Sequence, residues 1–83
     1  MIEPEKIVEK IQDALPDADV EVQDLTGTKD HYKARIVAEQ FADQNRVARH
    51  RMVYDALAEE MKGPIHALTL EVYTPEEWAT AKR

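Results

Sequence analysis

A helix stop, an apolar strand and a helix start follow one another between Gly63 and Trp78, and this stretch constrains the fold most. Gly63-Pro64 predicts the end of a helix, because glycine closes helices readily and proline cannot continue one. Ile65 to Tyr73 is the most apolar run and predicts a strand at the centre of a sheet. Thr74-Pro75-Glu76-Glu77 has the pattern of a capping box with proline at the first helical position. We therefore expect a short terminal helix that folds Trp78 back on the core.

The chain before this stretch predicts a helix, two strands and a second helix. Apolar residues at helical spacing between Pro4 and Leu15 indicate the first helix. Alternating patterns over residues 19–23 and 31–38, joined by a polar loop with Gly27 at its turn, indicate an antiparallel hairpin. Helices on one face of a small mixed sheet make an α+β two-layer sandwich. We expect one such domain over residues 1–83.

The second helix is expected from about Arg46 to Lys62, with Asp43 or Asn45 as its cap. Phe41, in the connector before it, is expected to anchor in the core. The main apolar stripe predicted for this helix consists of Val47, Tyr54, Leu57 and Met61, widened by Val53 and Ala56.

Composition excludes several classes of protein. The 83 residues include no cysteine, which rules out a disulfide scaffold, a thiol nucleophile and a self-contained thiolate metal site. No run approaches the ~18 apolar residues of a membrane span, and the N-terminus lacks a signal-peptide core. We therefore expect a cytoplasmic protein without membrane contact. No phosphate-binding loop, Ser/His/Asp grouping or paired-carboxylate motif is present, so we do not expect an enzyme.

Basic residues gather in one part of an otherwise acidic chain. The formal charge is −6, yet six basic and three acidic residues between Lys29 and Arg51 give that segment +3 and leave −9 elsewhere. Arg46, Arg49 and His50 are spaced to share one helix face, next to Arg51. Such a face can bind phosphate, carboxylate or an acidic protein surface, and it can equally be a solvated charged face. The net charge and the absence of a GxxG loop argue against nucleic-acid binding as the main activity.

The three histidines are the candidate metal ligands. His66 begins the apolar strand, beside the Gly63-Pro64 turn, and His31 begins the second strand. His66 can be either a structural residue at the edge of the core or a ligand, and His50 reads as a partly exposed helix residue. A two-iron two-sulfur cluster needs four ligands, usually thiolates and sometimes histidines. If this chain holds such a cluster, a partner must supply the sulfur ligands.

Three segments together resemble the BolA family. They are DHYKARIV (30–37), RVARHRMVYDALAEEM (46–61) and GPIHALTLEVYTPEEW (63–78), with Phe41 between the first two. The resemblance spans nearly the whole chain and implies a fold similar to class II KH domains, αββααβα in outline, with a short extra helical turn at residues 39–43. It also implies a non-enzymatic partner of a monothiol glutaredoxin, sharing a bridging two-iron two-sulfur cluster for cluster trafficking or iron and redox regulation.

The resemblance also assigns roles to residues. The glutaredoxin and glutathione would each supply a thiolate, while the histidine of the IHAL motif, His66, would be the ligand from this chain. Cysteine-type members carry a second ligand in the first hairpin loop, at a position that is Thr28 here, and His31 is the remaining candidate. The family's glycine after the phenylalanine is Asp43, which we expect to keep the turn. No cluster is expected in the isolated chain, which would be a monomer or a weak homodimer.

Some members of the family are DNA-binding transcriptional regulators. In this chain the basic face of Arg46, Arg49, His50 and Arg51 would carry that role, or would form part of the surface that faces a protein partner. A KH-like nucleic-acid-binding regulator is therefore the alternative function.

Overall fold

The computed structural model describes residues 2–27, 31–65 and 67–81. The elements in chain order are α1 (Pro4–Ala14), β1 (Asp19–Asp24), β2 (His31–Val37), a 3-10 turn η1 (Glu39–Phe41), α2 (Arg46–Ala56), α3 (Ala58–Met61), β3 (Ala67–Tyr73) and α4 (Pro75–Ala81). This order confirms the predicted α+β class, including the extra helical turn before α2. The described helices are all too short and too polar to cross a bilayer.

The three strands form one mixed sheet in the order β1-β2-β3. β1 and β2 pair antiparallel, as the hairpin prediction required, and β2 pairs with β3 in parallel. Parallel neighbours need a crossover, which α2 and α3 supply. The prediction that the apolar strand is central was wrong, because β3 is an edge and β2 is central. Its apolar residues Leu68, Leu70 and Val72 alternate with more exposed ones, so they cover one face only.

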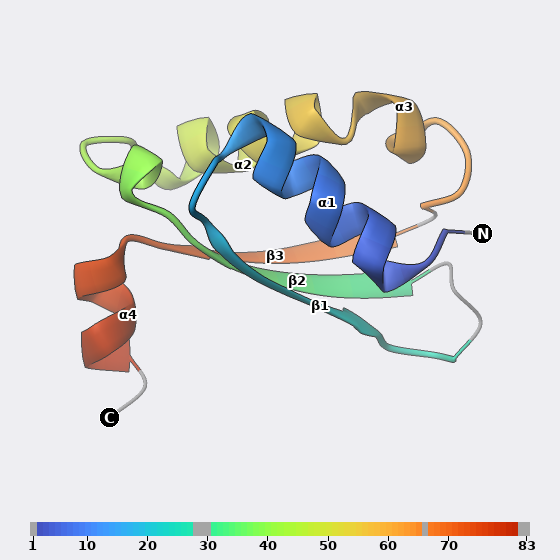
Figure 1. The fold of residues 1–83 in the computed structure, drawn as a ribbon, viewed down its shortest axis with the longest axis horizontal. Coiled ribbons are helices and arrows are strands. Elements are labelled where there is room, and N and C mark those ends of the chain that lie inside the picture. Colours follow the sequence, from blue (N-terminus) through green and yellow to red (C-terminus); the bar gives the residue numbers. More distant parts are fainter. Residues whose placement is uncertain (1, 28–30, 66, 82–83) are drawn as a thin grey trace.

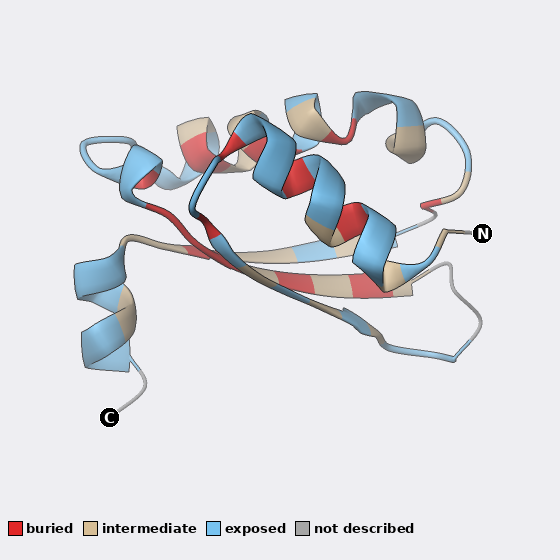
Figure 2. Ribbon diagram, viewed as in Figure 1, coloured by how far each residue is buried: buried red, intermediate tan, exposed pale blue. Residues whose placement is uncertain are grey.

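One layer of helices covers one face of the sheet (Figure 1). α1 and α2 lie on that face, with α3 following α2 at its end, and the buried positions of α1 and β2 face each other across the layers (Figure 2). Tyr32, Ala34 and Ile36 of β2 are at most 1% exposed. Fully buried partners from other elements are Ile7, Ile11, Phe41, Val53 and Leu57. The predicted anchoring role of Phe41 is therefore confirmed.

The helix expected from Arg46 to Lys62 is interrupted at Leu57, where α2 ends and α3 begins. Its predicted apolar stripe was also partly wrong, because Val47 is 67% exposed and Tyr54 is 38% exposed. The buried residues of α2 are Arg49 and Val53, and Leu57 follows them at the same spacing of four. Arg49 thus occupies a buried position, although the pattern had assigned it to the exposed basic face of the helix.

α4 departs from the helix layer. Figure 1 shows it beyond the end of the sheet and turned toward the face that the other helices leave open. Trp78 was predicted to fold back on the core, and this was wrong, because Trp78 lies outside the core cluster. Its ring lies 5.2 Å from the ring of Tyr73, and the guanidinium of Arg35 stacks 4.4 Å from its centre. Strand alternation explains this, because Tyr73 pairs with Val37, two positions from Arg35, so Tyr73 and Arg35 lie on the same face of the sheet.

Backbone turns are formed by the residues expected there. Gly27 has a φ of 77° and Asp43 one of 64°, so both take the left-handed conformation. The Asn45 side chain accepts a 2.8 Å hydrogen bond from the Ala48 amide, which caps α2.

Candidate functional site

His31 stands at the end of the sheet where β2 and β3 both begin. Its backbone oxygen accepts a 2.9 Å hydrogen bond from the Leu25 amide, which closes the hairpin loop. The next residue, Tyr32, is buried under the helices, so alternation directs His31 toward the other face of β2, where it is half-buried. Its partner in the parallel ladder is Ala67.

His66, the first predicted ligand, lies outside the described residues, as does Thr28. Its chain neighbour Ala67 is described, and Ala67 is the residue that pairs with His31. His31 therefore pairs with the residue that follows the other candidate ligand in the sequence. Within the described part of the chain, no group of three or more His, Cys, Asp or Glu side chains is arranged to hold a metal ion.

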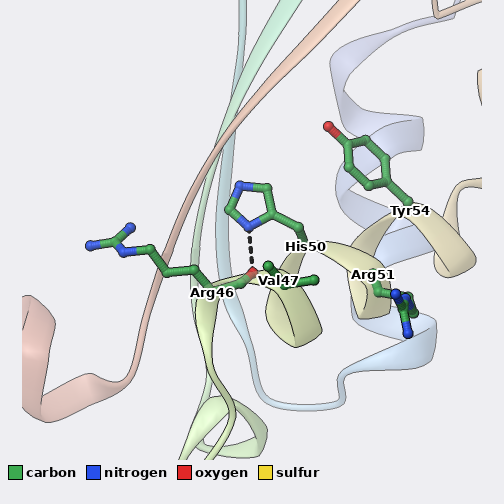
Figure 3. Close-up of a pocket in the computed structure, with 5 residues that line it drawn as sticks. All are labelled: Arg46, Val47, His50, Arg51 and Tyr54. Carbon is green, nitrogen blue, oxygen red and sulfur yellow. Dashed lines mark hydrogen bonds between the residues drawn. The ribbon is translucent and has the colours of Figure 1, made fainter.

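The second candidate region is the exposed side of α2. Arg46, Val47, His50, Arg51 and Tyr54 line an open pocket of about 490 Å³ with a largely apolar surface (Figure 3). Nδ1 of His50 lies 2.7 Å from the backbone oxygen of Arg46. A carbonyl oxygen only accepts, so Nδ1 donates in this bond, and Nε2 of the neutral ring is left as an acceptor.

Arg49 does not belong to this surface, which corrects the prediction that it shares an exposed face with Arg46 and His50. It is only 8% exposed, and its Nε donates to the backbone oxygen of Gln44 at 2.8 Å. Its two terminal nitrogens contact the Glu77 carboxylate at 2.7 and 3.2 Å, a bidentate pair. The prediction failed because helical spacing gives relative directions only and does not say which side of the helix meets the sheet.

Glu77 is the residue of this region whose role sequence reasoning missed. The capping box identified it as a partner of Thr74, and the reciprocal bonds are present at 3.0 and 3.1 Å. Its pairing with Arg49, 28 positions away, has no local signal. The bidentate Arg49 bonds and the Thr74 amide lower the pKa of Glu77 from 4.5 to about 2. The Arg49–Glu77 pair thus joins the first turn of α4 to the start of α2.

The other described basic residues of the Lys29–Arg51 segment lie on different elements. Lys33 pairs with Glu71 at 3.2 Å and Arg35 lies 3.8 Å from Asp19, both on the open sheet face. Arg46 and Arg51 make no ion pair with any other described residue. These two arginines, with His50, are therefore the basic face that remains on α2.

The comparisons place the chain among known proteins. The family model described as "BolA-like protein" matches residues 7–77. The DNA-binding transcriptional regulator BolA of Escherichia coli is 37% identical over 81 residues, covering 89% of this chain and 77% of that protein. BolA-like protein 1 of Mus musculus is 38% identical over 52 residues, and the match spans 63% of this chain but only 38% of the mouse protein.

A solved structure agrees with the architecture. The BolA domain of SufE1 from Arabidopsis thaliana superposes with a TM-score of 0.81 at 34% identity, covering 89% of this chain and 93% of that chain. The family model covers all three strands and most of α1, so the likeness is not confined to one motif. The chain belongs to the BolA-like protein family.

Proposed function

We propose that this protein is a non-enzymatic partner of a monothiol glutaredoxin and shares a bridging two-iron two-sulfur cluster with it. The observation that carries the proposal is the register of His31 with Ala67, the residue that follows His66 in the chain. His31 at this end of the sheet, and His66 adjacent in sequence to its ladder partner, would supply part of a ligand set in a chain of this family without cysteine, and would leave the thiolates to a partner.

The residues of this chain have defined tasks in such a complex. His66 and His31 would each offer a neutral imidazole nitrogen, while the glutaredoxin and glutathione would contribute sulfur ligands. When bound, the cluster supplies transferable iron and sulfide or a redox centre. The β1–β2 ladder and the Leu25–His31 backbone bond hold the His31 backbone in place, which reduces the ordering required on binding. Arg46, His50 and Arg51 form an additional surface for the partner.

The proposal is tested by visible circular dichroism while the protein is titrated into cluster-loaded monothiol glutaredoxin with glutathione. The unmodified chain should produce a new spectrum, and His66→Ala should abolish it. His31→Ala should weaken or alter it. His50→Ala removes a ring from the α2 surface and not from this end of the sheet, so at saturating protein it should give the same spectrum as the unmodified chain even where it weakens docking. An unchanged spectrum with binding seen by calorimetry would contradict a shared cluster and leave docking alone.

A second function is favoured by one specific observation, the name of the Escherichia coli relative as a DNA-binding transcriptional regulator. In this alternative, Arg46 and Arg51 contact phosphates and the protein regulates transcription. Duplex binding would then be lost in the Arg46→Ala/Arg51→Ala variant and unaffected by His66→Ala. The reverse pattern would exclude the alternative.

A further inference from the structure

We propose that the exposed face of α2 docks an acidic protein segment in which a large apolar side chain is flanked by carboxylates. The face consists of Arg46, Val47, His50, Arg51 and Tyr54, and is called the α2 face below. The inference deepens the proposed function, on which it rests for the identity of the partner, because it names the chemistry by which that partner would attach. Its test needs neither glutaredoxin nor iron.

The apolar part of the α2 face is unusual for this molecule. Val47, Tyr54 and Leu25 are the large hydrophobic residues that are exposed in the described part of the chain, and two of these three lie here. Val47 and Tyr54 are seven positions apart on one helix, so they form a single stripe two turns long. The stripe bounds the pocket of about 490 Å³, which is large enough to accept an aromatic or branched aliphatic side chain.

The charged part brackets that stripe. Figure 3 shows the Arg46 and Arg51 side chains leaving the helix in different directions, with Val47 between them. Neither arginine makes an ion pair with a described residue, whereas Lys33, Arg35 and Arg49 all have acidic neighbours. Two unpaired guanidinium groups around an apolar pocket are complementary to carboxylates around an apolar side chain.

His50 adds a directional acceptor. Because Nδ1 is engaged with the Arg46 carbonyl, the ring is fixed and its Nε2 is available as an acceptor for a backbone N–H of the docked segment. The ring also lies 6.4 Å from that of Tyr54, so the two form a continuous aromatic wall. A phosphate backbone would use the arginines but leave this wall and the pocket without a partner. A peptide with an apolar residue uses all of them, and we therefore favour it over nucleic acid.

Three peptides of equal length test the inference with the full ¹⁵N-labelled chain. One carries leucine-phenylalanine between Asp-Glu pairs, the second replaces the apolar pair by glycine-serine, and the third replaces the acidic pairs by lysines. The first peptide should shift amide resonances of residues 46–54 in a saturable manner. The other two should bind at least about tenfold more weakly, the fold-change for ~1.4 kcal/mol.

Matched variants separate this face from general electrostatics. Arg46→Gln/Arg51→Gln should weaken binding of the first peptide about tenfold, if each surface pair is worth ~0.7 kcal/mol. Lys6→Gln/Lys62→Gln removes the same charge from exposed sites elsewhere and should leave binding unchanged. Far-ultraviolet circular dichroism confirms that both variants are folded.

Several results would overturn the inference. Shifts spread over the whole surface, or equal binding of the glycine-serine peptide, would remove the role of the apolar pocket. Concentration-dependent shifts of residues 46–54 without peptide would assign the face to a second copy of this chain. Tighter binding of a DNA duplex than of the first peptide at the same residues would assign it to nucleic acid. A failed glutaredoxin titration alone would count against the proposed function and leave this inference standing.

Discussion

At the residue scale, the Arg49–Glu77 pair predicts a pH dependence of stability. The pKa of Glu77 is lowered from 4.5 to about 2, so the folded state favours the ionised carboxylate. A depressed pKa gives stability that is fully present above the unfolded value of 4.5 and is lost as the pH falls toward 2. Glu77→Gln should therefore lower the melting temperature most above pH 5, and the difference from the unmodified chain should close toward pH 2.

Thermal unfolding followed by circular dichroism from pH 7 to pH 2 measures this difference. Glu76→Gln is the matched control, since it removes a carboxylate from the same helical turn without touching Arg49. A gap between Glu77→Gln and the unmodified chain that stays constant at all pH values would show that the ionised pair contributes nothing.

Asp43 gives a second prediction at this scale. Its φ of 64° is strained for a residue with a Cβ atom, although aspartate tolerates this region better than most. Asp43→Gly should raise the free energy of unfolding by up to ~1 kcal/mol, because glycine relieves that strain. Asp43→Ala keeps the Cβ atom but loses the polar side chain, so it should lower stability. Urea denaturation of the three proteins decides the matter, and equal midpoints would show that the turn is unstrained.

At the scale of elements, α4 depends on contacts at its start. A seven-residue helix is too short to form alone, so the capping box, the Arg49 bonds and the Trp78 packing must hold it. Thr74→Ala should cost ~1 kcal/mol and release Trp78 from Tyr73 and Arg35. Its fluorescence should shift to the red before global unfolding. Thr80→Ala, on the exposed side of α4, should leave the spectrum unchanged.

The elements also show what local pattern can and cannot predict. Capping by Asn45, the hairpin around Gly27 and the Thr74–Glu77 box were predictable, because each depends on residues within a few positions. The edge position of β3 was not predictable. Its alternating apolar residues are compatible with one covered face whether the strand is central or at an edge of the sheet. Arg49 was assigned to the surface because no local feature of the sequence reveals that its guanidinium pairs with the carboxylate of Glu77.

At the scale of the whole molecule, charge that is clustered in sequence is separated in space. Residues 29–51 carry a formal +3, yet Lys33 and Arg35 lie on the open sheet face while Arg46 and Arg51 lie on α2 in the opposite layer. The basic segment therefore does not make one basic surface. The candidate site was predictable to the same extent. The residue types could be named from the sequence, whereas only the packing of the elements shows which of them share a surface.

This separation predicts how binding to duplex DNA should depend on salt. Arg46 and Arg51 are the two arginines of α2 without an ion pair among the described residues, so about two phosphates can be neutralised there. The plot of log K against log salt concentration should then have a slope near −2, since each neutralised phosphate contributes about −0.9. The formal charge of −6 opposes any stronger non-specific attraction of the protein to DNA.

Fluorescence anisotropy with a labelled duplex at several salt concentrations measures the slope, and Arg46→Gln/Arg51→Gln should reduce it to near zero. A slope steeper than about −5 would mean that a much larger basic surface contacts the DNA, and would favour the regulator over the glutaredoxin partner.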